Sequence, residues 1–130
     1  MTDGLQIVME NVSDLKHIEG FSLKRMLWLK NKILEEGIWN KPLSLDSKHC
    51  LVLDGQHRME VALALGLRVV PVVKYDYSLV EIWSLREKYS FDWSDVETRA
   101  LKGSIYPYKT VKHRFPGNVP LCHYPLEELY

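Results

Sequence analysis

Residues 51–59, LVLDGQHRM, decide how the chain folds, because they join two apolar segments through four polar side chains and one glycine. The apolar residues before Asp54 predict a buried strand that ends at this point. The residues after Gly55 predict a helix over 56–65, apolar on nearly every side after its first turn and ended by Gly66. A glycine between a strand and a helix permits a positive φ and lets the backbone approach a ligand closely.

The start of this helix has the chemistry of an anion site. A helix N-terminus presents unpaired N–H groups and a partial positive charge. Arg58 can donate to two oxygens of a phosphate and His57 to a third, while Asp54 is placed to hold a cation such as Mg²⁺ beside it. The alternative is structural: Asp54 caps the helix, and His57 and Arg58 point into solvent. The stretch matches neither of the common glycine-rich nucleotide loops.

The segments around this stretch mix strands and helices without regular βαβ alternation. Residues 23–36 predict an amphipathic helix with Ser22 as N-cap and Gly37 just past its end, with an apolar stripe of Leu23, Met26, Leu27, Ile33 and Leu34. The other predicted strands lie at 4–11, in a hairpin of 41–45 and 49–54 around the turn 46–48, at 68–77 and, with a weaker pattern, at 78–85. Pro71, within the strand at 68–77, indicates an edge or a bulge. A helix at about 94–102 begins with the capping box Ser94–Glu97 and ends at Gly103, and from Ile105 onward we expect loops with one short helix at 126–129. This order predicts the α+β class, with a mixed β-sheet packed against three main helices.

The length and composition favour one soluble domain. A chain of 130 residues suits a single core, so we expect one domain over 1–130 with an irregular tail over 115–130. Lys plus Arg and Asp plus Glu both number 17, which argues against a nucleic-acid coat or a polybasic membrane binder. No apolar run approaches the roughly 20 residues that span a bilayer. The N-terminus lacks the regions of a signal peptide, and Cys50 and Cys122 have no metal-type spacing, so a cytoplasmic protein with buried thiols is expected.

Residues 51–73, LVLDGQHRMEVALALGLRVVPVV, resemble the ParB/sulfiredoxin-type domain. The shared pattern is a strand, an Asp-Gly-x-His-Arg string, a tight helix, a glycine and a strand that carries Val-Pro-Val. Within this superfamily the chain is most similar to the free-serine kinase branch, which phosphorylates L-serine with a nucleotide donor. That branch also has an acidic residue near the N-terminus and a late P-x-K-T-x-x-H element, here residues 107–113, PYKTVKH. The resemblance covers about residues 5–115.

The resemblance implies a kinase that uses ATP or ADP as donor with Mg²⁺, and free L-serine or a similar small hydroxylated metabolite as acceptor. Its nucleotide phosphates are assigned to Gly55, Gln56, His57 and Arg58. Catalysis is assigned to Glu19 and Asp54, with Asp54 beside the Mg²⁺. Glu19 takes the place of the acidic residue that acts as base on the substrate hydroxyl, because a carboxylate within hydrogen-bond reach accepts its proton during transfer. The alternative is that Glu19 is a surface glutamate in a loop. His17 is close enough in sequence to compete for the role of base or to tune Glu19.

The late element supplies the expected substrate-binding residues: Lys109, Thr110, Lys112 and His113. A cationic, hydroxyl-bearing cluster suits the carboxylate or phosphate of a small substrate. Tyr106 and Tyr108 alternate with these residues, so aromatic faces are expected in the same pocket. The alternative is a solvated basic loop, and the run from Arg86 to Lys88 is most simply an exposed charged face.

Gln56 is where the chain departs from the family pattern. The commonest string has a second histidine or a threonine there, so donor preference is expected to differ. Sulfiredoxins place their catalytic cysteine at this position, so sulfinic-acid reduction is not supported. The rival reading is a ParB-like nucleotide- or DNA-binding regulatory module without phosphoryl transfer. Neutral charge and the lack of room for a helix-turn-helix domain count against DNA. The donor, the acceptor and the oligomeric state stay open.

Overall fold

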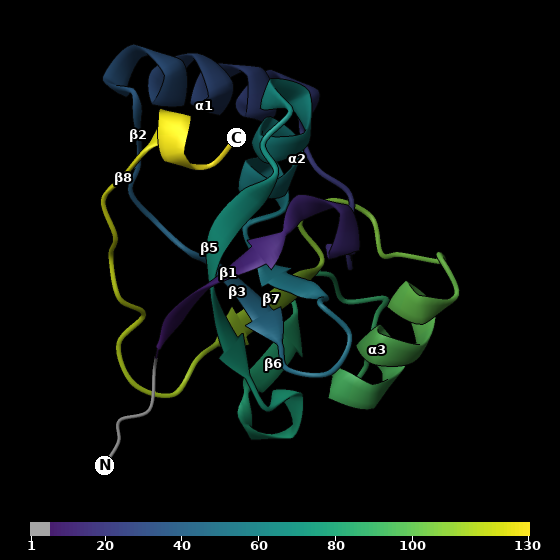
Figure 1. The fold of residues 1–130 in the computed structure, drawn as a ribbon. Coiled ribbons are helices and arrows are strands. Elements are labelled where there is room, and N and C mark those ends of the chain that lie inside the picture. Colours follow the sequence, from purple (N-terminus) through teal and green to yellow (C-terminus); the bar gives the residue numbers. More distant parts are fainter. Residues whose placement is uncertain (1–5) are drawn as a thin grey trace.

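The computed structural model describes residues 6–130, so the first two residues of the strand predicted at 4–11 lie outside the described residues. A four-stranded sheet forms the centre of the molecule (Figure 1). Its order is β1 (Ile7–Asn11), β5 (Val69–Tyr75), β3 (Leu43–Asp46) and β4 (Val52–Asp54). The β3–β5 pair is parallel and the other pairs are antiparallel, so the predicted mixed sheet and β3–β4 hairpin are confirmed.

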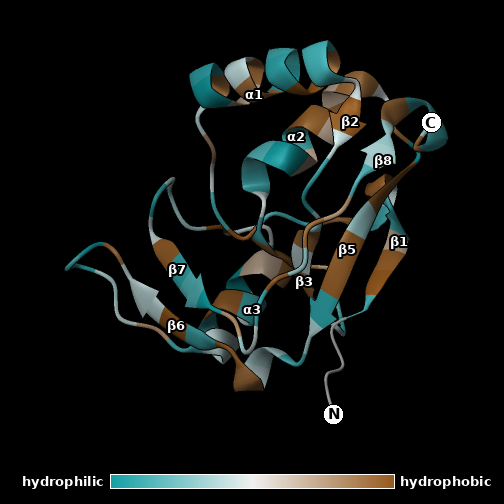
Figure 2. Ribbon diagram, turned by 90° about the vertical axis from the view of Figure 1, so that its left-hand side faces the viewer, coloured by the Kyte–Doolittle hydropathy of each residue, from teal (hydrophilic) through white to brown (hydrophobic). Residues whose placement is uncertain are grey.

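Both faces of this sheet are buried, because neighbouring residues of a strand point to opposite sides. Val72 packs in one core cluster and Val73 in the other, and both are fully buried. The first cluster lies under α1 (Leu23–Glu36) and α2 (Gln56–Leu65), and the second lies under α3 (Trp93–Leu101) and the antiparallel β6–β7 ribbon (Figures 1 and 2). The three predicted helices are therefore present, on opposite sides of the sheet.

The position of Pro71 corrects one expectation. It lies on β5, which has neighbours on both sides, so the predicted edge position is wrong. The parallel pairing with β3 begins only at Val72, one residue after the proline. Pro71 is thus placed just outside that ladder, where its missing N–H leaves no gap in the described pairing with β3.

The predicted caps of α1 are confirmed. Ser22 Oγ accepts the Arg25 N–H at 3.2 Å, and Gly37 ends the helix with a φ of 69°. The apolar stripe is confirmed only in part. Met26 and Ile33 are buried, whereas Leu23, Leu27 and Leu34 are exposed, because α2 covers only one narrow face of α1.

The start of α3 and the region after it differ from the sequence-based expectation. The capping box is formed by Asp92 and Asp95, not by Ser94 and Glu97, and it begins the helix at Trp93. The weaker strand is present as β6 (Glu81–Ser84), preceded by a short 3₁₀ turn, η2 (Tyr77–Leu79). The expectation of loops from Ile105 onward is wrong at β7 (Val111–Arg114), which pairs with β6.

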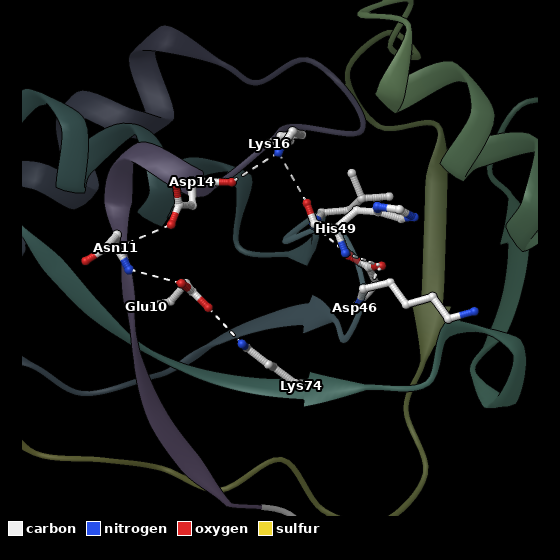
Figure 3. A network of polar contacts seen from close by, with 9 residues as sticks. Glu10, Asn11, Asp14, Lys16, Asp46, His49 and Lys74 are labelled. Atoms are coloured by element: carbon white, nitrogen blue, oxygen red, sulfur yellow. Dashed lines mark hydrogen bonds and ion pairs between the residues drawn. The ribbon is translucent and has the colours of Figure 1, made fainter.

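The far end of the β3–β4 hairpin is fixed by polar contacts (Figure 3). The buried Asp46 carboxylate accepts N–H bonds from Lys48, His49 and Leu51, which closes the turn. Lys16, just beyond η1 (Val12–Asp14), donates to the His49 carbonyl at 3.4 Å. Because the hairpin is held at this end, β4 delivers Asp54 to a defined place at its other end.

The C-terminal tail is part of the core. It contains β8 (Tyr124–Pro125), which pairs with β2 (Ile38–Trp39), and a 3₁₀ helix, η3 (Leu126–Glu128), where a short helix was predicted. Leu129 is fully buried, and its carbonyl accepts the N–H groups of Arg68 and Val69. None of the described helices is both long and apolar enough to cross a membrane.

We therefore expect Leu129→Ala to destabilise the protein by about 2–5 kcal/mol, because truncation leaves a cavity under α1 and α2. Urea unfolding followed by circular dichroism measures this loss. Leu121→Ala is the matched control, since Leu121 lies in the same tail but is 79% exposed. Equal midpoints for the two variants would contradict the packing of the tail.

Candidate functional site

The turn between β4 and α2 has a backbone that requires glycine. Gly55 has a φ of 115°, a region that other residues rarely adopt. A Cβ at this position would lie 2.5 Å from Leu43 Cδ2. The turn is therefore pressed against β3, and the first N–H groups of α2 are held at a fixed place.

A cavity of about 740 Å³ opens at this turn. Its walls come from α1, the end of β4, the first turn of α2 and the segment 108–115. The residues predicted for the site line it except Thr110 and Tyr106, and the expectation for Tyr106 is wrong because its ring is buried in the second core cluster. Two segments that are far apart in the sequence thus meet at one cavity: the Asp-Gly-x-His-Arg string and the late Lys-Thr-x-x-His element.

Glu19 lies on the cavity wall with one of its carboxylate oxygens held. Its Oε1 accepts the N–H groups of Thr110 at 3.2 Å and Val111 at 2.7 Å. Burial raises the pKa of Glu19, and these N–H bonds and the charge of Arg86 oppose the rise. A half-buried carboxylate with one oxygen fixed and a raised pKa suits a general base.

His57 is a neutral ring that also caps α1. Its Nε2 accepts the Ser22 N–H at 3.0 Å, so the ring proton lies on Nδ1. Burial lowers the pKa of His57, and the nearby Arg25 and His17 lower it further. The Nδ1–H group is left to donate to a ligand oxygen.

Arg58 carries a donor that the protein does not satisfy. Its Nε is buried and has no hydrogen-bond partner within residues 6–130. Burial lowers the pKa of Arg58, and the charge of Asp54 partly opposes this. Arg58 lines the cavity, so its positive charge favours an anion there.

Asp54 is exposed at the end of β4 and pairs with Lys41 at 3.7 Å. The part of the chain that the structure describes holds no group of three or more His, Cys, Asp or Glu side chains arranged around a metal. Mg²⁺ commonly uses one or two carboxylates together with substrate phosphates and water. A single carboxylate beside an anion site fits that pattern, and Asp54 is the residue that would supply it.

Gln56 points inward, away from the predicted phosphate contact. Its side-chain amide donates to the Val52 carbonyl, and its Oε1 lies 2.5 Å from His17 Nδ1. His17 Nε2 in turn lies 2.7 Å from Glu60 Oε2. Because both ends of the amide are engaged, Gln56 acts on the site by holding the first turn of α2, and only its backbone N–H remains available to a ligand.

The late element divides into lining and supporting residues. Lys109, Lys112 and His113 line the cavity, and Lys109 has a φ of 58°. Thr110 is fully buried, with its hydroxyl donating to the Pro107 carbonyl at 2.6 Å. Burial lowers the pKa of His113 to about 4, and its Nε2 lies 2.8 Å from the Tyr77 hydroxyl. His113 is therefore a neutral group at neutral pH.

Sequence reasoning missed the contribution to this cavity of α1 and of the residues that follow β2. Their lining residues include three cations and one exposed aromatic side chain: Arg25, Lys32, Lys41 and Trp28. The residues on α1 recur at helical spacing, which is the only signal the sequence offers. It does not tell which face of the helix meets a cavity.

Comparison with solved structures extends this description, although neither a protein-family model nor a curated protein matches the sequence. A free serine kinase in complex with AMP superimposes with a TM-score of 0.88 at 15% identity, covering 99% of this chain and 95% of that one. The chain has the fold of this kinase. The resemblance inferred from residues 51–73 is thus confirmed for the fold.

Two further structures share this fold. SbnI from Staphylococcus aureus, with a C-terminal truncation, matches with a TM-score of 0.84 at 14% identity, covering 95% of this chain and 88% of that one. A conserved hypothetical protein from Pyrococcus furiosus matches with a TM-score of 0.76 at 14% identity, covering 98% and 99%. At such identities the likeness establishes the fold, and the reaction has to be argued from the side chains in the cavity.

Proposed function

We propose that the protein is a nucleotide-dependent kinase that transfers a phosphoryl group to the hydroxyl of free L-serine or a similar small hydroxylated metabolite. One observation carries the proposal: Arg58 and the fixed N-terminus of α2 line the same cavity as Glu19. An anion seat next to a held base is what phosphoryl transfer to an alcohol requires. Structures of the free serine kinase in complex with AMP and with ADP support a nucleotide as donor.

In this proposal the terminal phosphate of ATP or ADP lies on the Gly55 turn, with Arg58 and His57 Nδ1–H donating to its oxygens. The acceptor hydroxyl oxygen attacks the phosphorus, and the bond from phosphorus to the leaving nucleotide oxygen breaks. The hydroxyl proton passes to Glu19. Mg²⁺ beside Asp54 would neutralise phosphate charge. Most of the catalysis is then positioning and electrostatic stabilisation by this chain.

Lys109 and Lys112 give the acceptor end of the cavity a positive charge, which suits the carboxylate of a free amino acid. His113 lines the same end of the cavity as an uncharged side chain, because its low pKa keeps the ring neutral. Trp28, 62% exposed at the rim on α1, offers an aromatic face to the nucleobase. These assignments belong to the same proposal.

The test is direct. The purified protein is incubated with Mg²⁺, L-serine and either ATP or ADP, and O-phosphoserine is followed by phosphorus NMR. A panel of other small alcohols tests the acceptor. If nucleotide binds in calorimetry while no acceptor is phosphorylated, the kinase proposal fails, and a ParB-like regulatory module that only binds nucleotide is favoured.

Arg58→Met is expected to weaken nucleotide binding about 10- to 100-fold, the equivalent of about 1.5–3 kcal/mol for a hydrogen bond to a charged group. Titration calorimetry with ADP measures it. Arg68→Met is the control, because Arg68 is exposed and does not line the cavity. Unchanged affinity in Arg58→Met would remove Arg58 from the phosphate site.

A further inference from the structure

The carboxylate of Glu19 is held by a segment that has little regular structure of its own. The N–H donors to Oε1 come from Thr110, at the end of the loop 107–110, and from Val111, the first residue of β7. Lys109, inside this loop, has a φ of 58°, in the left-handed region that favours glycine. The loop conformation therefore needs support from outside, and the position of the base depends on that support.

Arg86 provides it. This residue follows β6, and its Nη2 donates to the Tyr108 carbonyl at 2.6 Å while its Nε donates to the Thr110 hydroxyl at 3.0 Å. The same hydroxyl donates to the Pro107 carbonyl. One planar guanidinium thus joins the loop at two points, a geometry that a lysine ammonium does not reproduce.

Arg86 reaches the site only through the loop, since it is not among the residues that line the cavity. We propose that Arg86 is a positioning residue for phosphoryl transfer: its guanidinium fixes the loop 107–110 and thereby the Glu19 carboxylate. This inference rests on the proposed function. Residues 86–88 are exposed, as the sequence predicted, and this role of Arg86 is an addition to that description.

The charge of Arg86 also acts on Glu19. It lowers the pKa of that carboxyl, against the larger effect of burial, together with backbone N–H groups of residues 109–111. The other titratable groups nearby are the Tyr77 phenol, which is protonated because burial raises its pKa, and Lys109 on the same cavity wall. Removing Arg86 is therefore expected to raise the pKa of Glu19 further.

The experiment compares Arg86→Met and Arg86→Lys with Arg114→Met. Arg114 is the matched control, because it lies on the same two-stranded ribbon and its side chain is 76% exposed. We expect Arg86→Met to lower kcat about 10- to 100-fold with unchanged ADP affinity, as misplacement of a reacting group does. Carbon-13 NMR titration of the Glu19 carboxyl should give a pKa above the wild-type value. Arg86→Lys should keep the wild-type pKa and recover only part of kcat.

The outcomes separate the two proposals. If the wild-type protein phosphorylates no acceptor, the kinase proposal fails and the role of Arg86 in catalysis falls with it. If the wild-type protein is active and Arg86→Met matches Arg114→Met in kcat and in the Glu19 pKa, only the assignment of Arg86 is wrong. A loss of kcat with an unshifted pKa and a lowered Tm would show a merely structural role and would equally overturn it.

Discussion

Glu19→Gln is expected to lower kcat for phosphoryl transfer about 10²- to 10⁴-fold, the range that a positioned general base contributes. The amide keeps an oxygen that accepts the N–H groups of Thr110 and Val111, so the loop stays in place while the proton acceptor is lost. Steady-state kinetics with L-serine measures the effect, and ADP calorimetry is expected to show unchanged affinity. Glu35→Gln serves as control, because Glu35 is exposed on α1 outside this cavity.

The pH dependence of the wild-type enzyme gives a second check on this base. Only ionised Glu19 accepts a proton, and burial raises its pKa above the ordinary value of 4.5, so the acid limb of kcat/KM should lie above pH 4.5. The effect of this raised pKa on folding stability has the opposite dependence on pH. A raised folded-state pKa contributes stability that is present below pH 4.5 and is lost as pH rises through the folded pKa. Glu19→Gln should therefore be no less stable than wild type at neutral pH, and a large drop in Tm would contradict this.

Gly55→Ala is expected to destabilise the protein by about 2–6 kcal/mol and to abolish measurable nucleotide binding. Two terms add: backbone strain at a φ of 115°, about 1–3 kcal/mol, and overlap of the new methyl group with Leu43, about 1–3 kcal/mol. Urea unfolding measures the stability, and calorimetry measures binding of ADP.

Gly37→Ala carries the first term alone, so the difference between the two variants measures the overlap with Leu43. Gly37 also has a positive φ, of 69°, but an added Cβ would meet nothing within 4 Å. We expect this variant to be destabilised only by the backbone strain and to bind ADP as wild type does, because Gly37 is not among the residues that line the cavity. Equal destabilisation by the two substitutions would show that contact with Leu43 does not matter.

Local signals in the sequence were sufficient for the helices and the central hairpin. Ser22 and Gly37 mark the ends of α1, and Gly66 ends α2, because capping chemistry depends on a few neighbouring residues. The same reasoning misplaced the start of α3. Two strings in this region, at Asp92 and at Ser94, have the pattern of a capping box, and the sequence alone does not distinguish them.

Strand β7 was missed because its evidence is not local. Val111–Arg114 is four residues long, mixes apolar and charged side chains, and acquires its structure by pairing with β6 about thirty positions earlier. Pro71 was misjudged for a similar reason. Its tolerance inside β5 depends on where the β3 ladder begins, which only the assembled sheet determines.

The candidate site was partly predictable, since the Asp-Gly-x-His-Arg string and the late element could each be recognised by chemistry and resemblance. The inward orientation of Gln56 and the burial of Thr110 depend on partners elsewhere in the chain, His17 and Arg86. No spacing rule connects such pairs. The sequence therefore predicted most of the chosen cavity residues, but it did not predict the side chains that hold them in place.

The contact between Glu19 and Val111 spans 92 positions of the chain, and that between Glu19 and Thr110 spans 91. The Gly55 turn, in contrast, is made by residues that follow one another. During synthesis on the ribosome, the residues of the turn are together from the start, whereas the Glu19 carboxylate gains these two N–H partners only after the chain has passed residue 111. Contacts of such long range form late and slow the search for the native state. The position of the Glu19 carboxylate in the cavity is therefore fixed later than the residues of the glycine turn are brought together.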